Sequence, residues 1–202
     1  QGLHKIVFEK SDKTVTIENR AFAKNSYLEM VDAEDRPLSL EGSTFVGSGN
    51  SNSIDKGLQL RLNKASNIGP GTFMATGGIT SILLNQDDLS LDRWAFLSAD
   101  NGQHAYSSLR RGAVIYVDDD TTRKIIKDDA GNVGFEPSKD NAKVNPFILA
   151  VTNGGSFAKN ADLKAGALAT PMKKGYVFAG WYDNAKCSGE AVQKPKVNET
   201  YY

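Results

Sequence analysis

A phenylalanine recurs with nearly constant spacing through the first half of the chain. Successive copies lie 23, 28 and 23 residues apart. Each directly follows a small residue and lies five positions after an aliphatic one, at Phe22, Phe45, Phe73 and Phe96. A repeat of about 20–29 residues is typical of a solenoid, in which each unit stacks only on its neighbours. The spacing therefore predicts four stacked units whose phenylalanines form a column inside a shared core.

Two segments keep the same place after the preceding phenylalanine. Residues 28–33 and 79–84 each begin six residues after it and carry aliphatic residues at their first, fourth and sixth positions. This is the L-x-x-L-x-L pattern of leucine-rich repeats. Further alternating or apolar runs predict strands at 5–10, 15–17, 58–62 and 113–117. Polar or glycine-rich stretches predict loops at 47–53 and 98–103.

The combined motif, I-x-x-x-(A/S/T)-F followed by L-x-x-I-x-L, resembles the BspA-like leucine-rich repeats of bacterial surface proteins over residues 5–117. This chain departs from the family by its insertion at 47–53 and by lacking the Cys or Asn that often follows the Phe. The resemblance implies a mainly β fold with short helical turns, and a leucine-rich-repeat solenoid over residues 1–117.

The last part of the chain has a different character. An apolar strand-like run at 147–152 is followed by Asn153-Gly154-Gly155, Pro171, and the segment G-Y-V-F-A-G-W-Y at 175–182. These motifs resemble the Listeria–Bacteroides repeat of Gram-positive surface proteins, and 200–202 match the start of its closing T-x-Y-A-x-W. The resemblance implies a small grasp-like β module at 146–202, truncated at its C-terminus, of a kind often arrayed as spacers on the cell surface.

The aromatic residues of this module have two interpretations. Alternation would direct Tyr176, Phe178 and Trp181 into a small core, which a module of this size needs for stability. Trp181 and Tyr182 could instead form a sugar-binding platform. We favour the core.

Residues 118–145 read as a linker or a hairpin extension between the two modules. The three carboxylates at 118–120 lack the spacing and closing Glu of a calcium-binding loop, so a solvated terminus or a helix N-cap is the simpler interpretation. The segment 124–135 fits a hairpin or a short capped helix.

Composition and motifs argue against several function classes. The 24 basic and 24 acidic residues cancel, which gives no support to nucleic-acid binding, and no apolar run is long enough for membrane insertion. Cys187 is the one cysteine, so no intrachain disulfide can form, and it has no histidine near it in the sequence. The two histidines, His4 and His104, stand in unrelated contexts, and no catalytic or nucleotide-binding motif occurs. We therefore expect no enzyme, no metal and no cofactor.

Leucine-rich repeats bind through strand residues that point away from the core. By alternation these candidates are Met30, Asp32, Gln59, Arg61, Ser81 and Leu83; the simpler interpretation is that they are solvated strand positions. We expect a fragment of a longer, processed protein that is extracellular or on the bacterial cell surface. Its expected role is adhesion or protein binding, with a protein or host-matrix partner. A non-catalytic targeting appendage of a larger secreted enzyme and a purely structural stalk are the alternatives.

Overall fold

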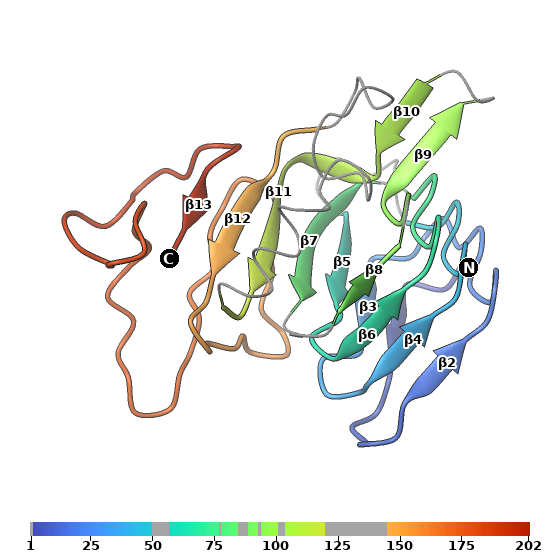
Figure 1. The fold of residues 1–202 in the computed structure, drawn as a ribbon, viewed down its shortest axis with the longest axis horizontal. Helices are drawn as coiled ribbons and strands as arrows, with labels where there is room; N and C mark the ends of the chain where they lie inside the picture. Colours follow the sequence, from blue (N-terminus) through green and yellow to red (C-terminus); the bar gives the residue numbers. More distant parts are fainter. Residues whose placement is uncertain are drawn as a thin grey trace.

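The computed structural model describes residues 2–49, 57–76, 78–84, 89–92, 94–100, 104–119 and 145–202, with the backbone alone at 97–100 and 104–107. Within these ranges, thirteen strands form a seven-stranded sheet, a four-stranded sheet and a hairpin (Figure 1). The large sheet contains β1 (Lys5–Val7), β3 (Met30–Asp32), β5 (Leu58–Arg61), β7 (Ile79–Leu84), β11 (Leu109–Val117), β12 (Ile148–Val151) and β13 (Thr200–Tyr201). The small sheet contains β2 (Val15–Ile17), β4 (Leu38–Leu40), β6 (Ala65–Ile68) and β8 (Ser90–Leu91). The antiparallel hairpin consists of β9 (Leu97–Asp100) and β10 (His104–Ser107).

The first eight strands alternate between the two sheets, so each sequence repeat contributes one strand to each sheet. Every strand pair in both sheets is parallel. Parallel pairing follows because equivalent segments of successive repeats run in the same direction. The mainly β prediction is confirmed. The predicted short helical turns are wrong for the described residues, which contain no helix; tight turns such as the one closed by Met74 N–H and Gly71 C=O (2.9 Å) connect the sheets instead.

The four repeat phenylalanines form the predicted column between the two sheets. Successive ring centroids lie 5.4, 5.3 and 5.0 Å apart, and the ring planes differ by 5–12°. This separation is close to the spacing of about 4.8 Å between paired strands, so each ring lies over the ring of the next repeat. Phe45, Phe73 and Phe96 are fully buried, whereas Phe22 at the end of the column is partly buried.

The chain makes the same tight turn before each phenylalanine. The residue two positions earlier has a positive φ of 59–63° in all four repeats, although only one of the four is a glycine: Arg20, Ser43, Gly71 and Trp94. The small residue before the ring is fully buried in three of the four repeats, at Thr44, Thr72 and Ala95. In two repeats it is a buried threonine whose hydroxyl donates to the carbonyl three residues back, as Thr72 does to Gly69 at 2.7 Å.

The C-terminal segment continues the large sheet. β12 pairs with β11 from Val114 and Ile148 onward, and β13 pairs with β12. The boundaries at 117 and 146 stay a prediction, and residues 120–144 of the proposed linker lie outside the described part of the chain. Between β12 and β13 the described backbone is made of turns and irregular segments.

The predicted core role of the aromatic segment holds for one residue only. Trp181 is buried, with Nε1 donating to the Ala169 carbonyl at 3.0 Å, so its indole cannot serve as a sugar platform. Tyr176 is 72% exposed and Phe178 37% exposed. The expectation failed because this segment is not a strand: Gly175 (φ +82°) closes a turn, so strand alternation does not apply.

Candidate partner-binding face

The six sequence candidates lie together on the outer face of the large sheet. Strand register places Met30, Gln59 and Ser81 in one row, and the next row is Asp32, Arg61 and Leu83. Their neighbours Val31, Leu60 and Ile82 point to the opposite face and are buried between the sheets. Alternation therefore assigned the face correctly on three strands.

The expectation that these six side chains face solvent is wrong for four of them. Met30 and Gln59 are partly exposed, but the C-terminal segment covers the rest of the face. Arg61 and Ser81 are fully buried, Leu83 is 1% exposed and Asp32 is 9% exposed. The covering segment comes from about a hundred residues further along the chain. The local sequence of the strands therefore cannot predict that these side chains are buried.

Arg61 is the main polar link to the covering segment. Its Nη1 atom lies 2.9 Å from Oε2 of Glu34, and its Nη2 atom donates to the carbonyls of Ala158 (3.0 Å) and Ala161 (3.1 Å). A planar guanidinium suits this task because its donors point in fixed directions. At the edge of this contact, Lys159 Nζ lies 3.8 Å from Asp35 Oδ2.

An apolar cluster holds the covering segment beside Arg61. Leu83 and Tyr116 from the sheet pack with Phe157, Leu163 and Trp181. The Tyr116 ring meets the Phe157 ring edge-on at 4.7 Å. The Tyr116 hydroxyl accepts from the Ala169 N–H at 3.0 Å. Burial raises the pKa of Tyr116 to about 12, and the backbone hydrogen bond from Ala169 lowers it only in part.

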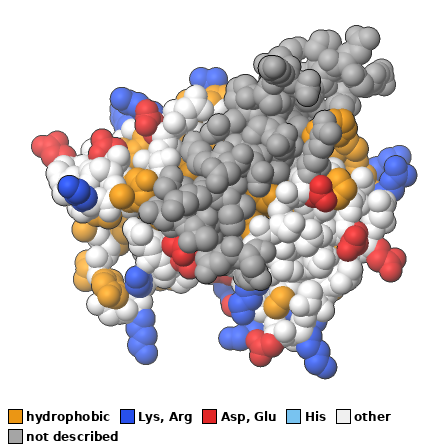
Figure 2. All heavy atoms as spheres, viewed as in Figure 1, with side chains coloured by type: hydrophobic (Ala, Val, Ile, Leu, Met, Phe, Trp, Pro, Cys, Tyr) orange, Lys and Arg blue, Asp and Glu red, His pale blue; other side chains and the backbone are white. Residues whose placement is uncertain are grey.

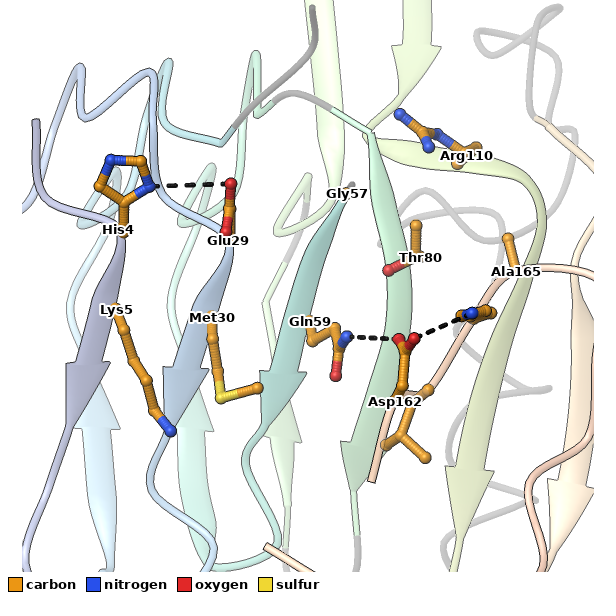
Figure 3. Close-up of a pocket in the computed structure, with 12 residues that line it drawn as sticks. His4, Lys5, Glu29, Met30, Gly57, Gln59, Thr80, Arg110, Asp162 and Ala165 are labelled. Carbon is orange, nitrogen blue, oxygen red and sulfur yellow. Dashed lines mark hydrogen bonds and ion pairs between the residues drawn. The ribbon is translucent and has the colours of Figure 1, made fainter. Parts of the chain in front are cut away.

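The uncovered part of the face is an open groove of about 780 Å³. Its floor is formed by β1, β3, β5 and β7, and residues 162–165 form one wall (Figure 3). At one end, His4 Nδ1 lies 3.7 Å from Glu29 Oε1. At the wall, Asp162 accepts from Gln59 Nε2 at 3.3 Å and lies 3.0 Å from Lys164 Nζ. The groove thus presents amide, hydroxyl, thioether and charged groups of both signs.

Several groove residues were not among the sequence candidates. Lys5 pairs in register with Met30, so aligning the first repeat with the second would have found it. Arg110 and the wall residues Asp162 and Lys164 also line the groove. The wall residues carry no repeat signal, because they belong to the segment that folds back over the sheet.

Within the described ranges, no three histidine, cysteine, aspartate or glutamate side chains gather as a metal site. Cys187 is exposed and free, and the side chain of His104 lies outside the described residues. The expectation of no enzymatic activity stays a prediction. No described helix is long and apolar enough to cross a membrane.

Residues 151–200 match the family model of the Listeria-Bacteroides repeat domain, which confirms the identification of the C-terminal segment. Repeats of this family are typical of bacterial surface proteins, and this fits a surface role for the chain. The match covers the C-terminal segment alone, and the resemblance of residues 5–117 to BspA-like leucine-rich repeats stays a prediction. No curated protein and no solved structure gives a significant match.

Proposed function

We propose that this chain belongs to a bacterial surface or secreted protein and binds a partner protein through the groove on the outer face of its large sheet. The observation that carries the proposal is that the face assigned by repeat alternation retains an open groove of about 780 Å³ after the C-terminal segment has covered the rest. Grooves of this volume hold ligands of substantial size. The Listeria-Bacteroides repeat at 151–200 supports the location.

We also infer that residues 1–117 are a leucine-rich-repeat solenoid. Three features support this inference: each repeat adds one strand to each of two parallel sheets, the phenylalanines stack in a column, and the turn before each ring repeats its positive φ. A solenoid offers an extended sheet face, which is the surface that repeat proteins use for binding.

The surface charge is consistent with a protein partner. Lys or Arg and Asp or Glu side chains are interspersed on the visible surface (Figure 2), and the chain carries no net charge. The net charge therefore provides no long-range attraction to a polyanion. Recognition of the partner protein would depend on local contacts inside the groove.

Binding to purified fibronectin, laminin and type I collagen tests the proposal. Met30→Arg places a long charged side chain in the groove and should reduce binding at least tenfold. Met172→Arg is the matched control, because Met172 is 55% exposed and does not line the groove. Circular dichroism verifies that both variants fold. Equal binding by both variants, or no binding by the parent chain, would count against an adhesive groove and favour a stalk.

A further inference from the structure

The chain's own C-terminal segment shows how the outer face holds a polypeptide. Arg61 donates to two backbone carbonyls of the segment, those of Ala158 and Ala161. Two residues earlier on the same strand, and on the same face, Gln59 donates to the carboxylate of Asp162. The bound stretch 161–164 has no regular secondary structure. Side chains of the sheet thus recognise an irregular segment by its carbonyl groups and by one carboxylate.

The open groove is the direct continuation of this interface. Gln59 belongs to both: its amide nitrogen holds the covering segment, and its Oε1 atom is buried with no hydrogen-bond partner in the described part of the chain. Lys5 and Met30 continue the row of Gln59 across β3 and β1. A second segment lying beside 162–165 would cross the partly exposed Gln59 and Met30 and then the exposed Lys5 (Figure 3).

The charges of the groove favour an acidic occupant. Both carboxylates of the lining already have cationic or imidazole neighbours, Glu29 with His4 and Asp162 with Lys164. Lys5 has an exposed side chain and no ion pair within the described residues. A carboxylate of a ligand is the group that an unpaired ammonium attracts most strongly. The described lining contains no Phe, Tyr or Trp ring, which leaves a sugar without the stacking surface that aromatic side chains provide.

We propose that the groove binds an acidic segment of the partner protein, in extended conformation, alongside residues 162–165 and across β5, β3 and β1. This proposal rests on the proposed function and specifies its ligand. The Listeria-Bacteroides repeat is then part of the binding site, because its residues 162–165 form the wall.

A peptide library tests this assignment without knowledge of the natural partner. Random dodecapeptides displayed on phage are selected on the immobilised full chain, and the recovered sequences should be enriched in Asp and Glu. The best peptide, synthesised with a fluorescent label, should bind the parent chain and lose at least tenfold in affinity with Lys5→Glu. Lys10→Glu, which makes the same charge change at an exposed position outside the groove, should leave the affinity unchanged.

The outcomes separate this inference from the proposed function. Selected peptides without acidic enrichment, or equal losses with Lys5→Glu and Lys10→Glu, overturn the acidic-segment assignment. Competition of matrix-protein binding by neutral glycans and not by the selected peptide also overturns it. If a matrix protein binds in a Met30-dependent way while the acidic peptide fails to compete, the proposed function stands and this inference falls. Absence of both kinds of binding contradicts both proposals.

Discussion

Arg61 and Glu34 form an ion pair at 2.9 Å in which the arginine side chain is fully buried and the glutamate side chain is 15% exposed. The two residues come from successive repeats, and the arginine also binds two carbonyls of the C-terminal segment. One side chain therefore connects neighbouring repeats to each other and to the Listeria-Bacteroides repeat. We therefore expect the two parts of the chain to depend on each other for stability.

Arg61→Ala should lower the free energy of unfolding by about 3–5 kcal/mol, because it leaves a largely buried carboxylate and two carbonyls without their donor. Glu34→Gln, which keeps an acceptor for the guanidinium, should cost less. Urea unfolding followed by circular dichroism measures both changes. Lys10→Ala, at an exposed site, is the control. A cost below about 1 kcal/mol for Arg61→Ala, within the range of a surface ion pair, would contradict this role.

Arg61→Ala should also separate the unfolding transitions seen by tryptophan fluorescence and by circular dichroism, which coincide in the parent chain. Trp181 belongs to the C-terminal segment and is buried, whereas Trp94 is 46% exposed, so the fluorescence change on unfolding comes mainly from Trp181. In the parent chain, fluorescence and circular dichroism should give one midpoint, as expected for a cooperative unit. In Arg61→Ala the fluorescence midpoint should lie at a lower urea concentration than the circular dichroism midpoint. Separate midpoints in the parent chain would show that the two parts unfold independently.

The position of each phenylalanine in the column should set the cost of removing it. Phe73 is fully buried with a stacked ring on each side, at 5.3 and 5.0 Å, so Phe73→Ala should cost about 3–5 kcal/mol. Phe22 is partly buried and stacks on Phe45 alone among the four, so Phe22→Ala should cost about half as much. Denaturant titrations compare the two. Equal costs would mean that the column does not act as one packed core.

Tyr116 should make the protein sensitive to alkaline pH. Its pKa rises from 10.0 in the unfolded chain to about 12 in the folded one, because burial disfavours the phenolate. The stability linked to this difference is fully present below pH 10 and is lost as pH rises from 10 towards 12, by about 3 kcal/mol in total.

Comparison with Tyr116→Phe isolates this contribution from those of the other tyrosines. The variant lacks the hydroxyl that accepts from Ala169, so it starts from a lower stability, but it should lose less between pH 10 and 12. Urea unfolding at pH 9, 10 and 11.5 gives the two slopes. Parallel pH profiles for parent and variant would rule out a buried, titrating Tyr116.

Two kinds of information in the sequence led to correct structural predictions. The spacing of the phenylalanines gave the column, because a repeat that stacks in register must superpose equivalent side chains. Alternation within β3, β5 and β7 gave the outer face of the sheet, because successive strand residues point to opposite sides. Both arguments use local geometry that is repeated from unit to unit.

The parts that could not be predicted depend on contacts between distant segments. The hydrogen bonds from Arg61 and Gln59 to the covering segment span 97, 100 and 103 residues. Nothing in the β5 sequence distinguishes a solvated arginine from one buried by such a segment. The prediction that Tyr176 lies in the core failed for another reason. Alternation holds only in strands, and Gly175 closes a turn just before Tyr176.

The C-terminal part also bears an exposed apolar surface. Met172, Tyr176 and Val177 are 55%, 72% and 94% exposed, and apolar side chains with basic neighbours are visible at this end of the molecule in Figure 2. Because Met172→Arg lies in this surface, the control variant also reports whether partners use it in place of the groove.

Photocrosslinking at a single position tests the central claim most directly. A benzoylphenylalanine placed at position 4 lies at the end of the groove without filling it, and one at position 172 lies outside it. Each variant is irradiated with fibronectin, laminin or type I collagen, whichever the parent chain binds, and adducts are located by mass spectrometry. The account predicts a covalent adduct from position 4 and none from position 172. Adducts from position 172 alone, or from neither position while binding persists, would contradict partner binding in the groove of the large sheet.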